Sequence, residues 1–252
     1  MIPSLIPRMG WSLLVCMIML DTQGQSVRII PEPEKGNTMM KVEIWSDVVC
    51  PFCYIGKREF ENALSRFPQR DSVVVIWRSF ELDPRAPQRS GSDMYGMLME
   101  KYGGTRDDAR ARVAGVVERG STVGIGFDMD KAVIGSSFDA HRLLQFAKSK
   151  GLGDEAKERL FKAYFTEGAH IADRGTLVRL GKEIGLGPKE VERMLASNEY
   201  GEAVRADERA AHLAGVRGVP YFLIDGGISV SGAQQSDAFL RALTQAWEQR
   251  ER

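Results

Sequence analysis

The sequence is poor in the residues that stabilise miniature or metal-bound scaffolds. It contains three cysteines among 252 residues, too few for a disulfide-stapled small protein or for a four-cysteine zinc site. It also has no excess of either charge, with 34 basic and 34 acidic residues. Since a chain without net charge has no overall field that attracts a polyanion, a nucleic acid is not expected as a partner.

The sequence also lacks an apolar run of about 20 residues, the length a membrane-spanning helix needs, so no membrane span is expected. Residues 9–20 are almost wholly apolar but too short. Two interpretations of this start stay open. Residues 1–24 are an export signal peptide, or translation starts at Met39-Met40 and the extension is not native. In both, residues 1–39 are a tail outside the fold.

The remaining composition is that of an ordinary globular chain. Hydrophobic residues make up 43% and charged residues 27%, which excludes collagenous, disordered and polytopic membrane classes. The length fits one domain with a large insertion. Because nothing after Met40 requires an oxidising compartment, the cytoplasm is the expected location, and export is the alternative if residues 1–24 are a signal peptide. The neutral charge leaves monomer and homodimer equally open.

A strand–helix–strand unit opens the folded part of the chain. Residues 41–45 alternate polar and apolar side chains, as a strand does. A helix is expected from Pro51 to about residue 67, where Pro68 ends it. Residues 73–77 form a continuous β-branched run, which predicts a strand covered on both faces. The three elements form a βαβ unit with a right-handed crossover.

A long helical block separates this unit from a hairpin. Helical patterns follow one another without a strand at residues 93–102, 106–120, 137–150, 154–167, 173–185, 188–196 and 199–214. Two strands at residues 221–224 and 228–231 then flank an Asp225-Gly226-Gly227 turn. A last helix is expected at residues 236–250. The fold class is therefore α/β with a mixed sheet. Residues 40–90 and 216–252 form one domain, and residues 91–215 are a helical insertion.

The chemistry centres on Cys50-Pro51-Phe52-Cys53. Cys50 follows the first strand at the start of the first helix, where unpaired N–H groups and the helix dipole stabilise a thiolate. A stabilised thiolate is also a better leaving group in disulfide exchange. Cys53 lies one turn deeper. We expect Cys50 to form a mixed disulfide with a partner and Cys53 to resolve it.

Zinc sites use the same two-residue spacing, so a metal has to be considered. No second cysteine pair follows. A zinc ion would have to take its other ligands from His141, His170 or His212, and none of these histidines has the spacing found in zinc fingers. The sequence therefore predicts no metal site. An inert cysteine pair remains as the other alternative.

Gly218-Val219-Pro220 stands directly before the third strand. The Val219–Pro220 bond is either cis, or Pro220 is an ordinary edge-strand proline. If the bond is cis, the Val219 backbone would turn outward beside Cys50 and could pair with an extended substrate.

Several segments together resemble one family. The chain is similar to the FrnE-type branch of the DsbA superfamily of thioredoxin-like proteins over nearly all of residues 40 to about 243. The segments that carry this resemblance are residues 42–56 (VEIWSDVVCPFCYIG), 80–84 (FELDP), 137–143 (SFDAHRL), 164–168 (YFTEG), 215–222 and 231–234.

The resemblance implies a thioredoxin-like fold with a helical insertion, thiol–disulfide oxidoreductase activity and a cis-proline loop at Val219-Pro220. It implies no cofactor beyond the dithiol, with glutathione as a reductant and thiol or disulfide proteins as partners. Related 2-hydroxychromene-2-carboxylate isomerases and kappa-class glutathione transferases usually carry serine where this chain has Cys50. The presence of Cys53 as well favours redox chemistry. A glutathione-dependent isomerase or transferase and a holdase-like peptide-binding module stay as alternatives.

Four further residues are candidates around the cysteines. In relatives the insertion caps the active site, so His141 could face Cys50, although a lone helical histidine is more often structural. Phe52 and Trp45 would give an apolar rim for a peptide, with Trp45 the better candidate for the core. Asp47 either caps the first helix or takes part in proton transfer to Cys53, and capping is the favoured role.

Overall fold

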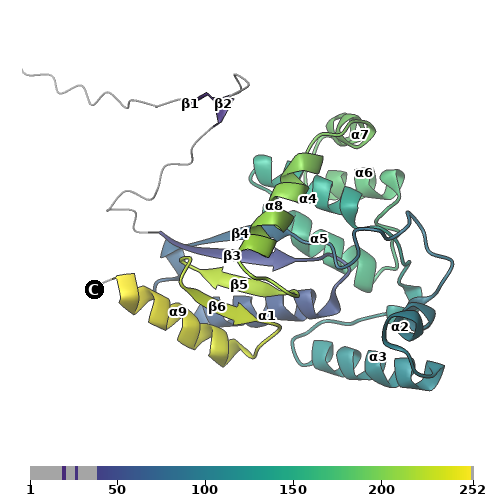
Figure 1. Cartoon of the computed structure of the whole chain (residues 1–252), viewed down its shortest axis with the longest axis horizontal. Coiled ribbons are helices and arrows are strands. Elements are labelled where there is room, and N and C mark those ends of the chain that lie inside the picture. Colours follow the sequence, from purple (N-terminus) through teal and green to yellow (C-terminus); the bar gives the residue numbers. More distant parts are fainter. Residues whose placement is uncertain (1–18, 21–25, 28–38, 251–252) are drawn as a thin grey trace, which may run out of the picture. The chain divides into compact units, whose positions relative to one another are not determined.

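The computed structural model describes residues 19–20, 26–27 and 39–250 (Figure 1). The chain divides into two units, Met1–Thr38 and Met39–Arg252. In the first unit, β1 (Met19–Leu20) pairs antiparallel with β2 (Ser26–Val27). The N-terminal segment on which the two interpretations depend lies largely outside the described residues. The third cysteine of the chain, Cys16, lies outside them as well.

The second unit is built on a four-stranded mixed sheet with the order β4-β3-β5-β6. The central strand β3 (Met40–Ser46) runs parallel to β4 (Val73–Ser79) and antiparallel to β5 (Tyr221–Ile224). The hairpin partner β6 (Ile228–Ser231) pairs with β5. The predicted βαβ unit and hairpin therefore join in one sheet, as the α/β class requires.

Two helices cover one face of this sheet: α1 (Pro51–Arg66) and α9 (Ser236–Arg250) (Figure 1). Their packing is aromatic. The ring of Phe60 lies 5.6 Å from Phe222 and 5.9 Å from Phe239, and the last two rings are 4.5 Å apart. Rings at these distances in edge or tilted geometry stabilise a core beyond the area they bury. This cluster holds α1, and with it the cysteine pair, on the sheet.

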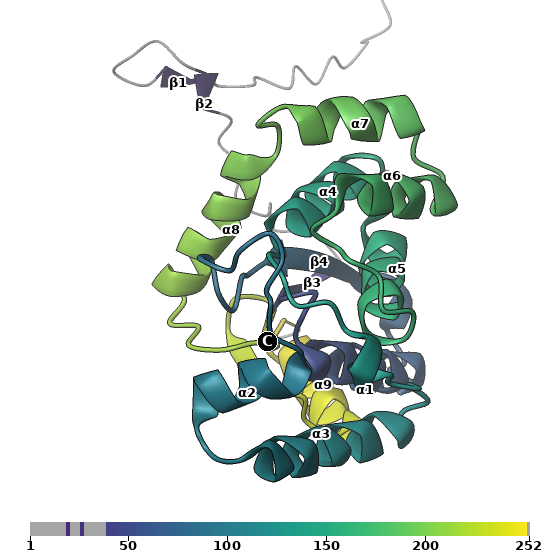
Figure 2. The ribbon, with the colours of Figure 1, turned by 90° about the vertical axis from the view of Figure 1, so that its right-hand side faces the viewer.

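Seven helices lie between β4 and β5 in the chain. The α2–α3 pair forms a hairpin that stands apart from α4 to α7 (Figure 2). A capping box of Thr105 and Asp108 starts the second helix of that hairpin, which satisfies two N–H groups at once. The helices are α2 (Met94–Tyr102), α3 (Arg106–Ser121), α4 (Phe138–Ser149), α5 (Gly153–Phe165), α6 (Arg174–Glu183), α7 (Pro188–Ala196) and α8 (Gly201–Leu213).

This arrangement confirms a thioredoxin-like fold with a helical segment inserted between its two halves. The second face of the sheet meets this segment through α8, because the indole Nε1 of Trp45 donates to the Asp207 carbonyl oxygen at 2.9 Å. Trp45 is 2% exposed and so belongs to the core. The division into two domains at residues 90 and 216 stays a prediction.

The prediction that β4 is covered on both faces is wrong. The strand is at the edge of the sheet, and Val74 is 38% exposed. A run of β-branched residues suits any pleated strand, so the composition alone does not distinguish an edge strand from a central one.

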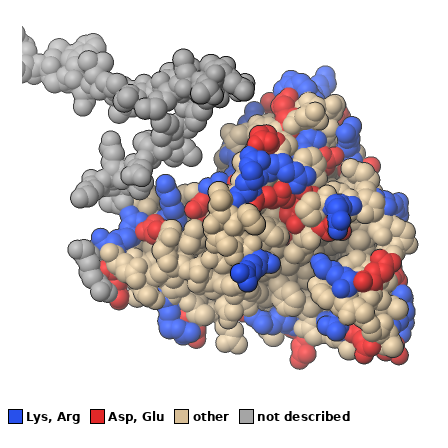
Figure 3. All heavy atoms as spheres, viewed as in Figure 1, with Lys and Arg blue, Asp and Glu red and all other residues tan. Residues whose placement is uncertain are grey.

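On the face shown in Figure 3, basic and acidic side chains are interspersed, as expected for a chain without net charge. Within the described parts of the chain, no helix has the length and apolar character needed to cross a bilayer.

Candidate functional site

The cysteine pair lies at the N-terminus of α1. Cys50 is the N-cap residue, and Pro51 occupies the first helical turn, where a missing N–H costs nothing. Both cysteines are free thiols. Cys50 is 4% exposed and Cys53 only 1%, and the Cys53 N–H donates to the Cys50 carbonyl at 3.0 Å. The sequence prediction of an outer and a deeper sulfur agrees with this geometry.

The loop before β5 lies against the outer sulfur. The Val219–Pro220 peptide bond is cis, and the Val219 carbonyl oxygen lies 3.6 Å from Cys50 Sγ, within hydrogen-bonding reach of the thiol. Gly56 lets α1 approach this loop, since a Cβ there would stand 2.9 Å from Pro220 Cγ. The missing side chain at residue 56 therefore sets how closely the loop rests on the helix.

Asp47 does not cap α1, so the favoured sequence interpretation is wrong. The helix has no side-chain cap, because the carboxylate points elsewhere. Its Oδ2 accepts from the Leu82 N–H at 2.7 Å, and its Oδ1 lies 3.2 Å from His141 Nε2. It also accepts from the Val49 N–H at 3.3 Å. These bonds tie the loop before the cysteines to the segment after β4 and to helix α4.

These contacts decide the ionisation of the carboxyl group. Burial raises the pKa of Asp47, but hydrogen bonding and charge interaction with His141, together with the Leu82 N–H bond, outweigh burial and hold the pKa below its usual value. Asp47 is therefore a buried carboxylate under the cysteine loop.

His141 is placed differently from the substrate-contacting role considered for it. Its side chain is fully buried. Nε2 faces Asp47, and Nδ1 has no hydrogen-bond partner among the described residues. Because no part of the His141 side chain is exposed, it could contact a bound molecule only if the surrounding residues moved.

Lys157 is a site residue that sequence reasoning missed. It lies on α5 and is fully buried, and its Nζ donates to the Ser46 carbonyl at 3.1 Å. The ammonium also lies over the rings of Phe161 at 4.9 Å and Trp77 at 5.5 Å, which favours the cation. Burial lowers the pKa of Lys157 to about 8, although the Cys53, Asp47 and Cys50 charges act in the opposite direction.

A signal for this lysine exists in the sequence. It occupies the apolar stripe of α5, three and four residues before Leu160 and Phe161, both of which are buried. A charged residue at helical spacing within such a stripe must be buried or must interrupt it.

The environment of the deeper thiol, Cys53, makes it hard to ionise. Burial raises the pKa of Cys53 well above its usual value, and hydrogen bonding and charge interaction with Cys50 raise it further. The charge of Lys157 opposes this effect. Cys53 is thus held as a thiol, while the charge of the buried Lys157 favours its thiolate.

A hollow of about 630 Å³, the Cys50 groove, opens at the outer sulfur. Its lining joins the cysteine loop, the cis-proline loop and the α2–α3 hairpin. Three of the residues singled out from the sequence lie on it: Cys50, Phe52 and Val219. Phe52 is 43% exposed, as an apolar rim requires. Cys53, Pro220 and His141 are buried and are not part of the lining.

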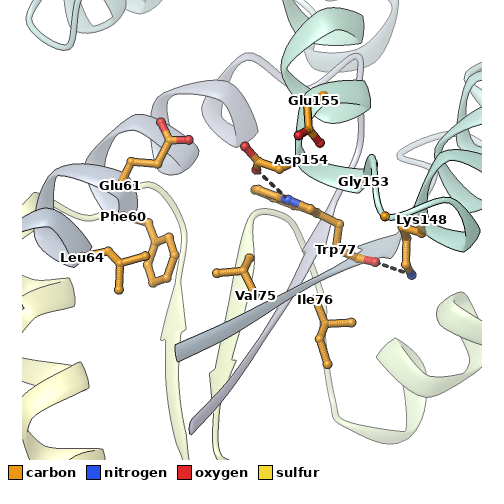
Figure 4. A pocket seen from close by; sticks show the side chains of 11 residues that line it. Phe60, Glu61, Leu64, Val75, Ile76, Trp77, Lys148, Gly153, Asp154 and Glu155 are labelled. Carbon is orange, nitrogen blue, oxygen red and sulfur yellow. Dashed lines mark hydrogen bonds between the residues drawn. The ribbon is translucent and has the colours of Figure 1, made fainter. Parts of the chain in front are cut away.

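A second hollow of about 550 Å³ lies between α1, the edge strand β4 and the start of α5 (Figure 4). Trp77 spans it, with its Nε1 donating to Asp154 Oδ1 at 3.0 Å and its carbonyl accepting from Lys148 Nζ at 2.7 Å. Neither Cys50 nor Cys53 lines this hollow. Across the described portion of the chain, no cluster of three or more metal-ligating side chains occurs.

Comparisons with known proteins show the family of this chain. The model of the DSBA-like thioredoxin domain matches residues 41–244. A Bacillus subtilis protein, the uncharacterized protein YwbO, is 30% identical over 204 residues, which cover 81% of this chain and 95% of that protein. The structure of a probable DsbA oxidoreductase, SCO1869 from Streptomyces coelicolor, is 41% identical with a TM-score of 0.80, covering 83% of this chain and 90% of that one.

A more distant structure shares the fold alone. The 2-hydroxychromene-2-carboxylate isomerase is 15% identical, with a TM-score of 0.59 over 84% of this chain and 98% of its own. The family match spans the cysteine pair, the helical segment and the cis-proline loop together. The chain belongs to the DSBA-like thioredoxin domain family of thiol–disulfide oxidoreductases.

Proposed function

We propose that this protein is a thiol–disulfide oxidoreductase of the FrnE type, with Cys50 as the nucleophile and Cys53 as the resolving thiol. One observation carries the proposal. Cys50 caps α1 at the floor of a groove, while Cys53 lies buried one turn deeper with a raised pKa. An outer sulfur on the lining of a groove and a more deeply buried inner thiol are what a two-step exchange needs.

The exchange proceeds in two balanced steps. The Cys50 thiolate attacks a partner disulfide, forms a mixed disulfide and releases one partner thiolate. Cys53 then loses its proton and attacks Cys50 Sγ, which closes the Cys50–Cys53 disulfide and releases the second partner thiolate. The nearby Lys157 ammonium stabilises the Cys53 thiolate in this step, as its opposing effect on the Cys53 pKa indicates.

The same pair works in reverse when the partner is the reductant. The cysteine pair donates two electrons in the first direction and accepts two in the reverse direction, so no further cofactor is required. We propose glutathione or a thioredoxin-type protein as the electron relay, thiol or disulfide molecules as partners, and the cytoplasm as the location. Monomer and homodimer fit this chemistry equally.

Replacing Cys53 with serine tests the proposal. The variant is expected to accumulate mixed disulfides, because Cys50 still attacks but nothing resolves the product. After incubation with oxidised glutathione, mass spectrometry should find one glutathione on nearly every Cys53→Ser molecule and almost none on the wild type. The Cys50→Ser/Cys53→Ser double variant is the control, since it has neither thiol of the pair.

Two other results would contradict the proposal in different ways. Full catalytic activity in Cys53→Ser would favour the glutathione-dependent isomerase, which needs only the residue at position 50. An unchanged ability to hold unfolded peptides, with no adduct on any variant, would favour the holdase-like binding module.

A further inference from the structure

The Cys50 groove has an unusual set of polar groups. Its polar side chains outside the cysteine are Lys101, Arg112, Arg119 and the Tyr102 hydroxyl, and every other lining residue is apolar or glycine. The lining includes no carboxylate, amide or aliphatic hydroxyl. A ligand in this groove would therefore meet cations and hydrogen-bond donors, and few acceptors, from the side chains around it.

The three cations form no ion pair with the described residues. Arg112 interacts through its charge with Asp108, one turn earlier on the same helix, and lowers the pKa of that carboxyl group. Lys101 Nζ and the Arg112 guanidinium each lie 5.7 Å from the centre of the Tyr102 ring. Arg119 donates to the Ala233 carbonyl, which leaves its charge uncompensated. The groove thus offers positive charge to an anion at its outer wall.

The remaining wall is apolar and partly open. The described residues include five exposed large hydrophobic side chains, and three of them, Phe52, Leu82 and Tyr102, line this one groove. Such a gathering marks a binding surface more often than chance exposure does. Met94 and Met97 add flexible, polarizable side chains, which adapt to varied apolar ligands.

Size restricts the occupant. The volume of about 630 Å³ falls in the range of sites for small organic molecules. Cys50 is only 4% exposed, and the α2–α3 hairpin forms the wall beside it, so a disulfide in a folded protein would not reach the sulfur without opening the groove.

We propose that the Cys50 groove binds a low-molecular-weight thiol or disulfide with an apolar body and a carboxylate, and without an ammonium group. The proposal rests on the oxidoreductase function above and narrows its partner. Glutathione fits less well, because its ammonium and its amide N–H groups would find few acceptors in this lining, and an unpaired buried polar group is costly.

The reaction with a dithiol of this class balances as follows. One thiolate of the ligand attacks Cys50 Sγ of the oxidised enzyme and expels Cys53 as a thiolate. The second thiol of the ligand, after losing its proton, attacks the ligand sulfur in the mixed disulfide and expels Cys50. The ligand leaves as a cyclic disulfide, and the enzyme gains two electrons and two protons.

Dihydrolipoate and dihydrolipoamide provide a matched pair of probes. Both molecules have the same dithiol and the same apolar chain. Dihydrolipoate ends in a carboxylate, whereas dihydrolipoamide ends in a neutral amide. We expect dihydrolipoate to reduce the oxidised full-length protein about fivefold faster at low salt, the effect of one favourable, partly exposed charge interaction. The rates are measured by stopping the reaction at successive times and labelling the newly formed protein thiols with a maleimide. Added salt should reduce the rate advantage of dihydrolipoate.

Two variants locate the charge. In Lys101→Gln/Arg112→Gln/Arg119→Gln, which removes all three groove cations, the two probes should react at about equal rates, a loss of the same charge interaction. Arg110→Gln is the matched control, because Arg110 lies on the same helix as Arg112 and is not part of the lining. Its preference should match that of the wild type.

The outcomes separate this proposal from the function it rests on. Equal rates for both probes with an active wild-type protein, or a preference that survives Lys101→Gln/Arg112→Gln/Arg119→Gln, would overturn the proposal alone. Faster reaction with reduced, unfolded ribonuclease A at equal thiol concentration would also overturn it and would assign the groove to extended polypeptide. A protein that no thiol reduces would overturn the oxidoreductase function as well.

Discussion

Cys50→Ser is expected to lower the rate of thiol–disulfide exchange by at least about a thousandfold, because a hydroxyl does not form the mixed disulfide on which the cycle depends. The fold should be unaffected. Serine is slightly smaller than cysteine, and its hydroxyl can also donate the hydrogen bond that the Cys50 thiol makes to the Val219 carbonyl.

The assay measures the rate at which the protein reduces a small disulfide while a thiol reductant regenerates the Cys50–Cys53 dithiol. Circular dichroism checks that the variant is folded. The result also separates the candidate functions, since relatives with isomerase activity usually carry serine at this position. Retained turnover in Cys50→Ser would contradict the redox mechanism and support the isomerase.

Lys157→Met is expected to stabilise the fold at pH 7 by about 2 kcal/mol. A depression of the lysine pKa from 10.5 to about 8 corresponds to a cost of about 3 kcal/mol for keeping the buried ammonium charged. Loss of the bond to the Ser46 carbonyl, recorded at 3.1 Å, offsets about 1 kcal/mol of this gain. Methionine fills a similar unbranched volume.

The sign of the pH dependence follows from the same shift. Because the pKa of Lys157 is lower in the folded protein, the unfolded chain binds more protons between about pH 8 and pH 10.5. The contribution of Lys157 to stability therefore rises with pH through this window, and the advantage of Lys157→Met should shrink there.

Urea unfolding from pH 6 to pH 10 measures this difference. Lys162→Met is the matched control, because Lys162 is an exposed lysine on the same helix. A constant difference between wild type and Lys157→Met across the range would contradict a charged, buried Lys157. A slower second step in Lys157→Met, seen as a longer-lived mixed disulfide, is the expected functional consequence.

The local parts of the site could be read from the sequence. A cysteine pair between a strand and a helix start, a proline before a strand, and a turn rich in glycine each act through the backbone within a few residues. The positions of Cys50, Cys53 and Val219 therefore agreed with the structure.

The buried charges beneath the cysteines could not be read in the same way. The Asp47–His141 contact joins residues 94 positions apart, and the bond from Lys157 to Ser46 spans 111 positions. The capping role for Asp47 failed because its carboxylate bonds to the N–H groups of Val49 and Leu82 and faces His141, and not the first N–H groups of α1. The groove wall likewise depends on where the α2–α3 hairpin packs, and neither composition nor periodicity encodes this position.

A redox titration shows whether Cys50 and Cys53 form a reversible redox pair. The protein is equilibrated in glutathione buffers of graded potential, its free thiols are alkylated, and mass spectrometry identifies the state of each cysteine. We expect one two-electron transition to a Cys50–Cys53 disulfide at a potential between those of about −270 mV for thioredoxin and about −120 mV for DsbA. Cys53→Ser should form only a Cys50–glutathione mixed disulfide. If the wild-type pair forms no disulfide at any potential, the two cysteines are not a redox pair.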